Sequence, residues 1–104
     1  MYQLAVTFSD EIYEYVAQWP MVARKSMGDQ LIRSADSIGA NIAEAVGLWH
    51  EADKRRLLVI ARGSLYETEH WLNRAEARGL LPHGYTGRLE EIAKTLNGMI
   101  KTPI

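Results

Sequence analysis

Apolar residues recur at steps of three and four along four stretches of this 104-residue chain, and short gaps rich in glycine or proline separate them. Such spacing places the apolar side chains on one face of a helix. Helices joined by short connections pack antiparallel to their neighbours. We therefore predict an all-α fold, an antiparallel up-down-up-down four-helix bundle in which residues 1–104 form one domain.

The first predicted helix spans residues 3–18 and ends at Trp19, because the residue before Pro20 is pushed out of the α region. Its inward positions are Leu4, Phe8, Ile12, Tyr15 or Val16, and Trp19.

The second predicted helix begins at Ser26, since Ser26 and Asp29 match the capping pattern of a hydroxyl followed three residues later by an acid. Two rows repeat every seven residues and form its apolar seam. One row is Leu31, Ile38 and Ala45, and the other is Gly28, Ala35, Ile42 and Trp49. Gly47 is the predicted stop.

The third predicted helix starts near Asp53 as N-cap and ends at Gly79 and Pro82. Its two apolar rows are Leu58, Leu65 and Leu72, and Leu57, Ala61, Ser64, Thr68, Trp71 and Ala75. The fourth spans residues 86–101, with Thr86 as a possible cap, and Leu89, Ile92, Leu96 and Met99 or Ile100 point inward.

Two glycines, Gly39 and Gly63, lie inside strong helical patterns, where each costs about 1 kcal/mol relative to alanine. We predict that both are packing positions at which another helix comes close.

The charge balance gives no direct support for a nucleic-acid protein, because twelve basic residues face thirteen acidic ones. There is no cysteine, which excludes disulfides, thiolate metal sites and a cysteine nucleophile. The longest apolar run, residues 57–61, is far shorter than the ~20 residues that cross a bilayer. The first residues lack the basic region of a signal peptide, so a cytoplasmic protein without membrane association is expected.

Catalytic signals are weak. Glu67 and His70 form one E-x-x-H motif, whereas di-metal bundles use two together with further glutamates. No nucleophile has a credible base, and no glycine-rich phosphate loop is present. We therefore expect no enzyme, catalytic residue, cofactor or metal; a bundle metalloenzyme using Glu67 and His70 is the alternative.

Basic residues gather near the start of the third helix, at Lys54, Arg55, Arg56 and, further on, Arg62. Residues 21–62 carry seven basic and five acidic side chains, a local charge of +2. Cations in a helix's first turn oppose its dipole, which indicates another use for them. We predict these four residues as candidate contacts to nucleic acid; a solvated helix end is the alternative.

A polar stripe flanks the apolar seam of the second helix and faces polar residues of the third. We interpret it as a network between helices that fixes their register, with a polar binding groove as the alternative. Its candidate members are Arg33, Ser37, Asn41, Glu44, Glu67 and Glu69.

Five tyrosines and three tryptophans stand against one phenylalanine, and such residues suit half-wet interfaces. Val6 and Tyr13, together with Tyr2, give the first helix a second apolar face. We predict self-association through it; a monomer with partly exposed tyrosines is the alternative.

Two blocks, residues 28–44 and 60–69, resemble the bacterial four-helix-bundle family of proteins encoded in intervening sequences of 23S ribosomal RNA genes. The family's Q-L-x-R-(S/A)-x-x-S-I-x-x-N-I-A-E-G pattern is matched by Gln30, Leu31, Arg33, Ser37, Ile38, Asn41, Ile42, Ala43 and Glu44. Its I-A-x-G-S-L-x-E-x-E pattern is matched by Ala61, Gly63, Ser64, Leu65, Glu67 and Glu69. One departure is Ala45, which replaces the glycine that usually follows the first block.

The family is similar to the accessory protein of diversity-generating retroelements, a pentameric barrel with a basic surface. The resemblance therefore implies a non-enzymatic homo-oligomer, a ring of five, with RNA, DNA or a nucleoprotein as a further partner. It also implies that the polar positions shared with the family stabilise the bundle or the ring. A protein-interaction module that binds no nucleic acid is the alternative function.

Overall fold

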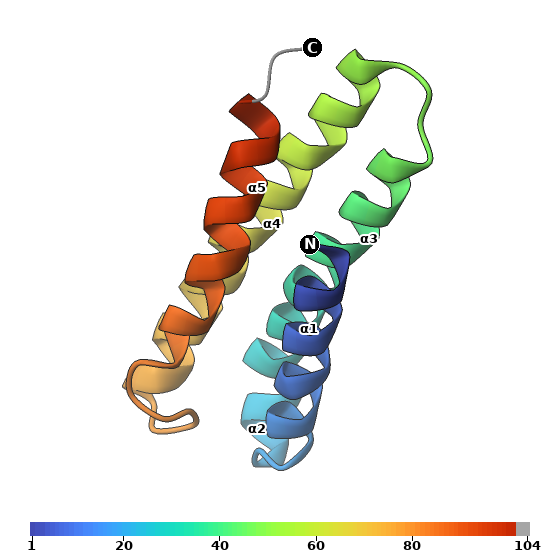
Figure 1. Cartoon of the computed structure of the whole chain (residues 1–104). Helices are drawn as coiled ribbons and strands as arrows, with labels where there is room; N and C mark the ends of the chain where they lie inside the picture. The colour runs from blue at the N-terminus through green and yellow to red at the C-terminus, as the bar shows by residue number, and fades with distance from the viewer. Residues whose placement is uncertain (102–104) are drawn as a thin grey trace.

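The computed structural model describes residues 1–101, and within that range every regular element is helical. The elements are α1 (Tyr2–Ala17), α2 (Met21–Ala23), the π-helical turn η1 (Arg24–Gly28), α3 (Asp29–Val46), α4 (Glu51–Ala77), the 3₁₀ turn η2 (Tyr85–Leu89) and α5 (Glu90–Lys101). The predicted all-α four-helix fold is confirmed. Followed by colour in Figure 1, the chain descends α1, ascends α3, descends α4 and ascends α5.

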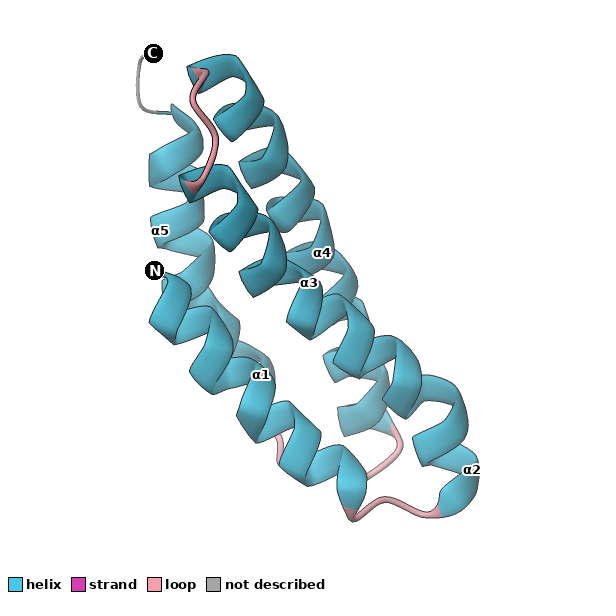
Figure 2. Cartoon of the chain, turned by 90° about the vertical axis from the view of Figure 1, so that its right-hand side faces the viewer, coloured by secondary structure: helices cyan, strands magenta, loops and turns pink. Residues whose placement is uncertain are grey.

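The bundle is elongated, with extents of 45 × 22 × 18 Å. Figures 1 and 2 show that α1 lies beside α3 and stops short of the end where α3 joins α4. That end, which we call the α3–α4 end, is therefore built from three of the four long helices.

The core follows the predicted helical rows. Leu31, Ile38 and Ile42 of α3 face Leu58, Leu65 and Leu72 of α4, and all six are buried. The other helices add Phe8, Ile12 and Val16 from α1 and Leu89, Ile92, Leu96 and Ile100 from the last segment. Of the two paired alternatives, Val16 and Ile100 are inside, whereas Tyr15 and Met99 are exposed.

The second helix begins at Met21, five residues before the predicted start. Pro20 has an extended ψ of 150° and serves as N-cap, so the helix starts as soon as the proline has been passed. The Ser26 hydroxyl donates back to the Val22 carbonyl at 2.6 Å and caps nothing. The capping pattern of Ser26 and Asp29 was therefore a wrong indication, because both lie inside one continuous helical segment.

Gly28 is the glycine that close packing requires. A Cβ at this position would stand 2.7 Å from Val16 Cγ1 and 3.2 Å from the Ala23 carbonyl oxygen. The π-helical turn η1 ends here, and π turns are rare in helices. The backbone of this turn thus packs directly onto α1.

The two glycines predicted as packing positions, Gly39 and Gly63, differ from each other, and α1 comes close only to the buried Gly39. At Gly39 a Cβ would meet Ala5 and Val6 of α1 at 3.7 and 3.8 Å, which is ordinary contact. At Gly63 nothing lies within 4 Å of a built Cβ, and the residue is exposed. Gly63 as a packing position within the protomer was therefore wrong.

The α3–α4 connection corrects two further predictions. Gly47 is the C-cap of α3, as predicted, but Trp49 lies beyond it and is 90% exposed, so it does not belong to the apolar seam. α4 starts at Glu51 after an extended His50, and Asp53 lies in its first turn rather than at the N-cap.

The end of α4 matches its prediction closely. Gly79 has a φ of +73°, which favours glycine, and its N–H donates to the Glu76 carbonyl while that of Leu80 donates to Ala75. These two bonds form a Schellman motif that ends the helix. Thr86 caps no helix and instead lies within η2.

Candidate functional site

The basic cluster is placed at the α3–α4 end. Arg55 and Arg56 are exposed in the second turn of α4, and the partly exposed Lys54 lies 3.6 Å from Glu51 in an ion pair at the surface. Exposed pairs of this kind contribute little to stability. Three cations thus project from one short segment, in three directions around the helix, since residues follow each other at about 100°.

Arg62 does not join this cluster. It is half-buried, and its guanidinium donates to the Asn97 side-chain carbonyl of α5 at 3.2 Å. The bond links α4 to α5, so Arg62 holds two helices together two turns away from the other three cations.

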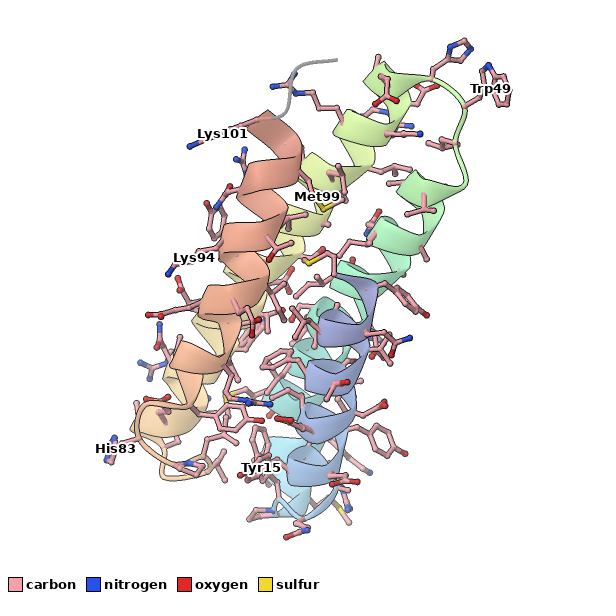
Figure 3. All side chains as sticks on the ribbon, in the orientation of Figure 1. Tyr15, Trp49, His83, Lys94, Met99 and Lys101 are labelled. Carbon is pink, nitrogen blue, oxygen red and sulfur yellow. The ribbon has the colours of Figure 1, made fainter. Side chains whose placement is uncertain are left out.

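Trp49 adds an aromatic ring to the basic end. Figure 3 shows its indole projecting from the α3–α4 connection, at the same end of the bundle as Lys101. The sequence pattern missed this residue because its spacing matched the heptad row that Gly47 interrupts. The glycine stop was the signal that could have placed Trp49 outside the helix.

The chemistry of this end suits a polyanion with exposed bases. Cations contact phosphates, and an exposed indole offers a stacking surface for a base. Glu51 and Asp53 in the first turn of α4 partly offset the local positive charge. They also complement the helix dipole, which the neighbouring cations oppose.

A polar network does join α3 to α4, but hydroxyl groups form it. Ser37 Oγ and Ser64 Oγ share a hydrogen bond of 2.7 Å, and Asn41 Nδ2 donates to Ser37 Oγ at 3.0 Å. Deeper in the bundle, Thr68 donates to Ser34 Oγ at 2.9 Å, and both residues are buried.

Of the predicted network members, Ser37 and Asn41 take part. Arg33, Glu44, Glu67 and Glu69 are exposed, and within residues 1–101 no hydrogen bond or ion pair links them to another helix. At about 100° per residue, Arg33 and Glu44 point at least 120° away from Ile38, whereas Asn41 points about 60° away. Those two side chains are therefore directed past the facing helix.

The isolated E-x-x-H motif is part of an exposed surface. Glu67 accepts a hydrogen bond from Trp71 Nε1 at 3.2 Å, and the His70 ring packs edge-on against the Trp71 ring at 4.7 Å. Within residues 1–101, His, Asp and Glu side chains nowhere form a group of three or more that could hold a metal ion.

A second cluster, absent from the sequence predictions, ties η2 to α1. Arg88 pairs with the Glu11 carboxylate, and the Tyr85 hydroxyl donates to the same carboxylate at 3.1 Å. Burial, followed by the nearby Glu11 charge, raises the pKa of Tyr85 to about 12. The Tyr85 ring also packs edge-on against Tyr15.

Glu76 holds the start of η2. Its carboxylate accepts hydrogen bonds of 3.1 Å from the backbone N–H and from the hydroxyl of Thr86. The backbone bond is the main reason that the pKa of Glu76 lies below its usual value.

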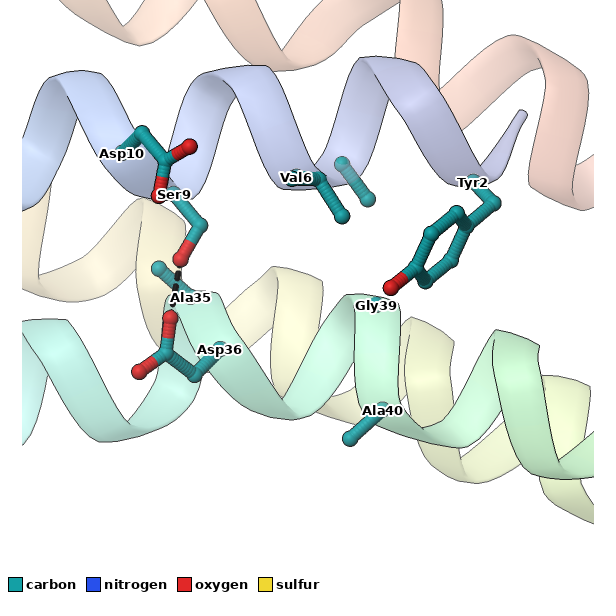
Figure 4. A pocket seen from close by; sticks show the side chains of 9 residues that line it. Tyr2, Val6, Ser9, Asp10, Ala35, Asp36, Gly39 and Ala40 are labelled. Atoms are coloured by element: carbon teal, nitrogen blue, oxygen red, sulfur yellow. Dashed lines mark hydrogen bonds between the residues drawn. The ribbon is translucent and has the colours of Figure 1, made fainter.

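A shallow groove of about 260 Å³ lies between α1 and α3, as Figure 4 shows. Ala35, Gly39 and Ala40 form its α3 wall, and Tyr2 and Val6 face them from α1. Ser9 donates to Asp36 across one end. Tyr2 and Tyr13 are 45% and 63% exposed, so the second apolar face of α1 is only partly covered by the protomer.

Among the helices within residues 1–101, none has the length and apolar character that crossing a membrane requires.

Comparison with known proteins identifies a family and a similar solved structure. The family model described as 23S rRNA-intervening sequence protein matches residues 1–102. A crystal structure from Bacteroides thetaiotaomicron, described as a protein of unknown function from the S23 ribosomal protein family, is similar with a TM-score of 0.85. The two sequences are 30% identical, and the similarity covers 97% of this chain and 98% of the other. Among curated proteins, no relative matches.

Proposed function

Because the chain belongs to the family of 23S rRNA-intervening sequence proteins, we propose that it is a non-enzymatic, homo-oligomeric binding protein that forms a ring of five and contacts single-stranded nucleic acid or a ribonucleoprotein. The observation that carries the nucleic-acid part is the α3–α4 end. There Trp49, 90% exposed, lies in the connection that precedes α4, and the first two turns of α4 carry the cations Lys54, Arg55 and Arg56.

An exposed indole costs solvation free energy and contributes nothing to this core. Its position at the end of the bundle that also carries three cations favours a use in binding. Stacking on an aromatic ring contributes about 1–3 kcal/mol per base and tolerates any sequence. Cations contribute through release of counterions, which makes binding depend on salt. The expected ligand is therefore recognised by backbone and stacking rather than by base sequence.

The self-association part is supported by α1. Tyr13 is 63% exposed and Tyr2 is 45% exposed, and Tyr2 lines a groove whose other wall is formed by small residues of α3. Aromatic residues are enriched in interfaces between proteins, where they contribute large contact areas. In a ring each protomer offers such a surface to a different surface of the next, so several copies of the basic end would be presented together.

The test measures binding of a fluorescein-labelled single-stranded RNA of about twenty nucleotides by anisotropy, at several salt concentrations. Replacement of Lys54, Arg55 and Arg56 by alanine is expected to weaken binding at least tenfold and to lower the salt slope by about two, since each phosphate contact on a single strand contributes roughly 0.7. Trp49→Ala is expected to weaken binding with an unchanged salt slope.

A matched control replaces Lys25, Arg74 and Lys94, which are also exposed, by alanine and removes the same charge. This control should retain most of the binding. Equal losses in both triple variants would show that only net charge matters and would exclude the α3–α4 end as the site. A protein partner that survives nuclease treatment, without any RNA binding, would favour the protein-interaction module.

A further inference from the structure

The side of α4 that faces away from the bundle carries an apolar centre. Val59, Ile60 and Tyr66 are 40%, 43% and 55% exposed and surround Gly63. Arg56 and Glu67, which are also exposed, flank them at the two ends. At about 100° per residue all six point within about 60° of the direction of Gly63. We call these six residues the α4 outer face.

Packing within the protomer does not require a glycine at position 63. Glycine is the least favourable residue in a helix interior after proline. Nothing lies within 4 Å of the position that a Cβ would take there. At Gly28, in contrast, a Cβ would stand 2.7 Å from Val16. A bare backbone at the middle of an exposed apolar patch is what allows a helix from outside to come close.

We propose that the α4 outer face binds the same face of a second copy of this chain, with the two α4 helices antiparallel and a twofold axis passing beside Gly63. In this arrangement the two Gly63 residues lie level with each other, and the two helices run in opposite directions from there. A residue a given number of positions before Gly63 is therefore level with the partner's residue the same number of positions after its Gly63. Contacts of this kind join like surface to like, and each one forms twice.

The apolar residues of the face meet in this register. Val59 and Tyr66 lie on the same side of Gly63, at about 40° and 60° from it. The twofold axis is perpendicular to the plane that contains the two α4 helices. It therefore leaves Val59 and Tyr66 of both copies on the same side of that plane. Val59 is therefore about one residue, roughly 1.5 Å along the axis, from the level of the partner's Tyr66. Both side chains would bury area that the single protomer leaves exposed.

The charges of the face are complementary in the same register. Arg56 and Glu67 lie on the other side of Gly63, at about 20° and 40°. Arg56 is then about 4.5 Å along the axis from the level of the partner's Glu67, which is within reach of an arginine. Trp71 Nε1 holds one oxygen of Glu67 at 3.2 Å and so orients the carboxylate. This pairing of opposite charges in a symmetric register is why the occupant is a second copy.

The inference is independent of the ring proposed above, because a twofold contact joins identical surfaces and a ring contact joins two different ones. Both contacts together would pair two rings. Light scattering coupled to size exclusion separates the cases, since the protomer weighs 11.8 kDa.

The decisive experiment is a charge swap that is followed by sedimentation over a range of concentrations. Arg56→Glu and Glu67→Arg are each expected to raise the dissociation constant of the pair at least tenfold. The double variant is expected to return it to within about threefold of the parent. If the ring forms, the parent is a pair of rings, and each single variant should halve its mass to that of about five copies. If the ring does not form, the parent is a dimer, and each single variant should be a monomer.

The matched control reverses Lys94 and Glu90, which are exposed on α5, and should change nothing. A double variant that fails to restore association would overturn the proposed register. A parent that shows no twofold pairing at high concentration, as a monomer or as a single ring, would overturn the contact itself without deciding about the ring.

A second measurement uses the absence of cysteine from the chain. In Gly63→Cys the two thiols would lie beside the axis, where the short Cα–Cα distance of a disulfide can be reached. Mild oxidation should link pairs of chains several times faster than in Val22→Cys, whose residue is 84% exposed and lies on α2, outside the α4 outer face. Equal rates in the two variants would show that the axis does not pass beside Gly63.

Discussion

The helical glycines of this protein illustrate how little a residue type says without its neighbours. Gly28 and Gly39 both face α1, but only Gly28 lies where a side chain cannot fit. The obstacle there is Val16 Cγ1, on a β-branched side chain that is buried and stiff at χ1. The distances at Gly39 leave room for a methyl group.

We predict that Gly28→Ala lowers the free energy of unfolding by about 1–3 kcal/mol, because overpacking forces the turn away from α1. Gly39→Ala should be neutral or stabilise by up to about 1 kcal/mol, since alanine favours the helix. Urea denaturation followed by circular dichroism measures both. Equal effects at the two sites would contradict the packing difference.

Thr68 is the buried centre of the hydroxyl network. It donates to Ser34 Oγ at 2.9 Å and is also 2.7 Å from the Ser64 carbonyl of its own helix. Thr68→Val keeps the shape and removes the donor, so we expect a loss of about 1–2 kcal/mol in unfolding free energy. Thr95→Val is the matched control, because Thr95 makes the same bond to its own helix while exposed. A loss of similar size in the control would attribute the effect to helix propensity.

Polar contacts hold the element η2 in place. It is held to α1 by Glu11 and to α4 by Glu76. Tyr85 gives this attachment a pH dependence. Its pKa is raised from 10.0 to about 12 in the folded protein, so the folded state retains the proton more tightly than the unfolded chain. The resulting stability is complete below pH 10 and is lost as the pH rises from 10 towards 12.

We therefore predict that Tyr85→Phe flattens the fall of stability between pH 10 and 12, measured by urea denaturation at each pH. At pH 7 the variant should be less stable by about 0.5–1.5 kcal/mol, because the bond to Glu11 is lost while the ring contacts remain. Tyr13→Phe, at an exposed position, should keep the slope of the parent. An unchanged slope in Tyr85→Phe would show that another group controls alkaline unfolding.

The spacing of apolar residues predicted the four long helices, because each helix buries rows of apolar side chains that repeat every three or four residues. It failed where two local signals compete. At Ser26 a capping pattern coincided with a helix that Pro20 had already started. At Trp49 the heptad spacing continued past the glycine that stops the helix. Boundaries depend on single residues, whereas the core depends on whole rows, so the core was the safer prediction.

The candidate site was predictable in part for a related reason. Charge runs such as residues 54–56 are visible in the sequence and lie on the surface as expected. The network between α3 and α4 depends on distances between helices, which no pattern within one helix gives. Short hydroxyl side chains fit the narrow gap between the helices, whereas the longer Arg33 and Glu44 point past it.

At the scale of the whole molecule, the surfaces proposed for different uses are centred on different parts of the bundle. The basic residues and Trp49 occupy the α3–α4 end, which α1 does not reach in Figures 1 and 2. The exposed tyrosines lie on α1, and the α4 outer face lies on a helix that packs mainly against α3 and α5. Only Arg56 belongs to both the basic cluster and the α4 outer face, so the Trp49, Tyr13 and Glu67 variants disrupt binding, the ring and the twofold contact separately, whereas Arg56 variants affect two of them.

The ring gives the last prediction. Tyr13 is 63% exposed on α1, and an aspartate there would place a charge in an apolar contact. Tyr13→Asp should therefore reduce the mass from about five copies, or from paired rings, to a smaller species, while circular dichroism shows unchanged helix content. Val22→Asp is the control, because Val22 is 84% exposed elsewhere.

Salt distinguishes this contact from the nucleic-acid site. An apolar ring contact should persist from low to moderate salt, whereas binding through Lys54, Arg55 and Arg56 should weaken steeply. A Tyr13→Asp variant with the mass of the parent would exclude the α1 face from the ring. Loss of the ring by salt alone would show instead that charged residues hold the copies together, and would direct the search for the ring contact to the acidic residues of α1.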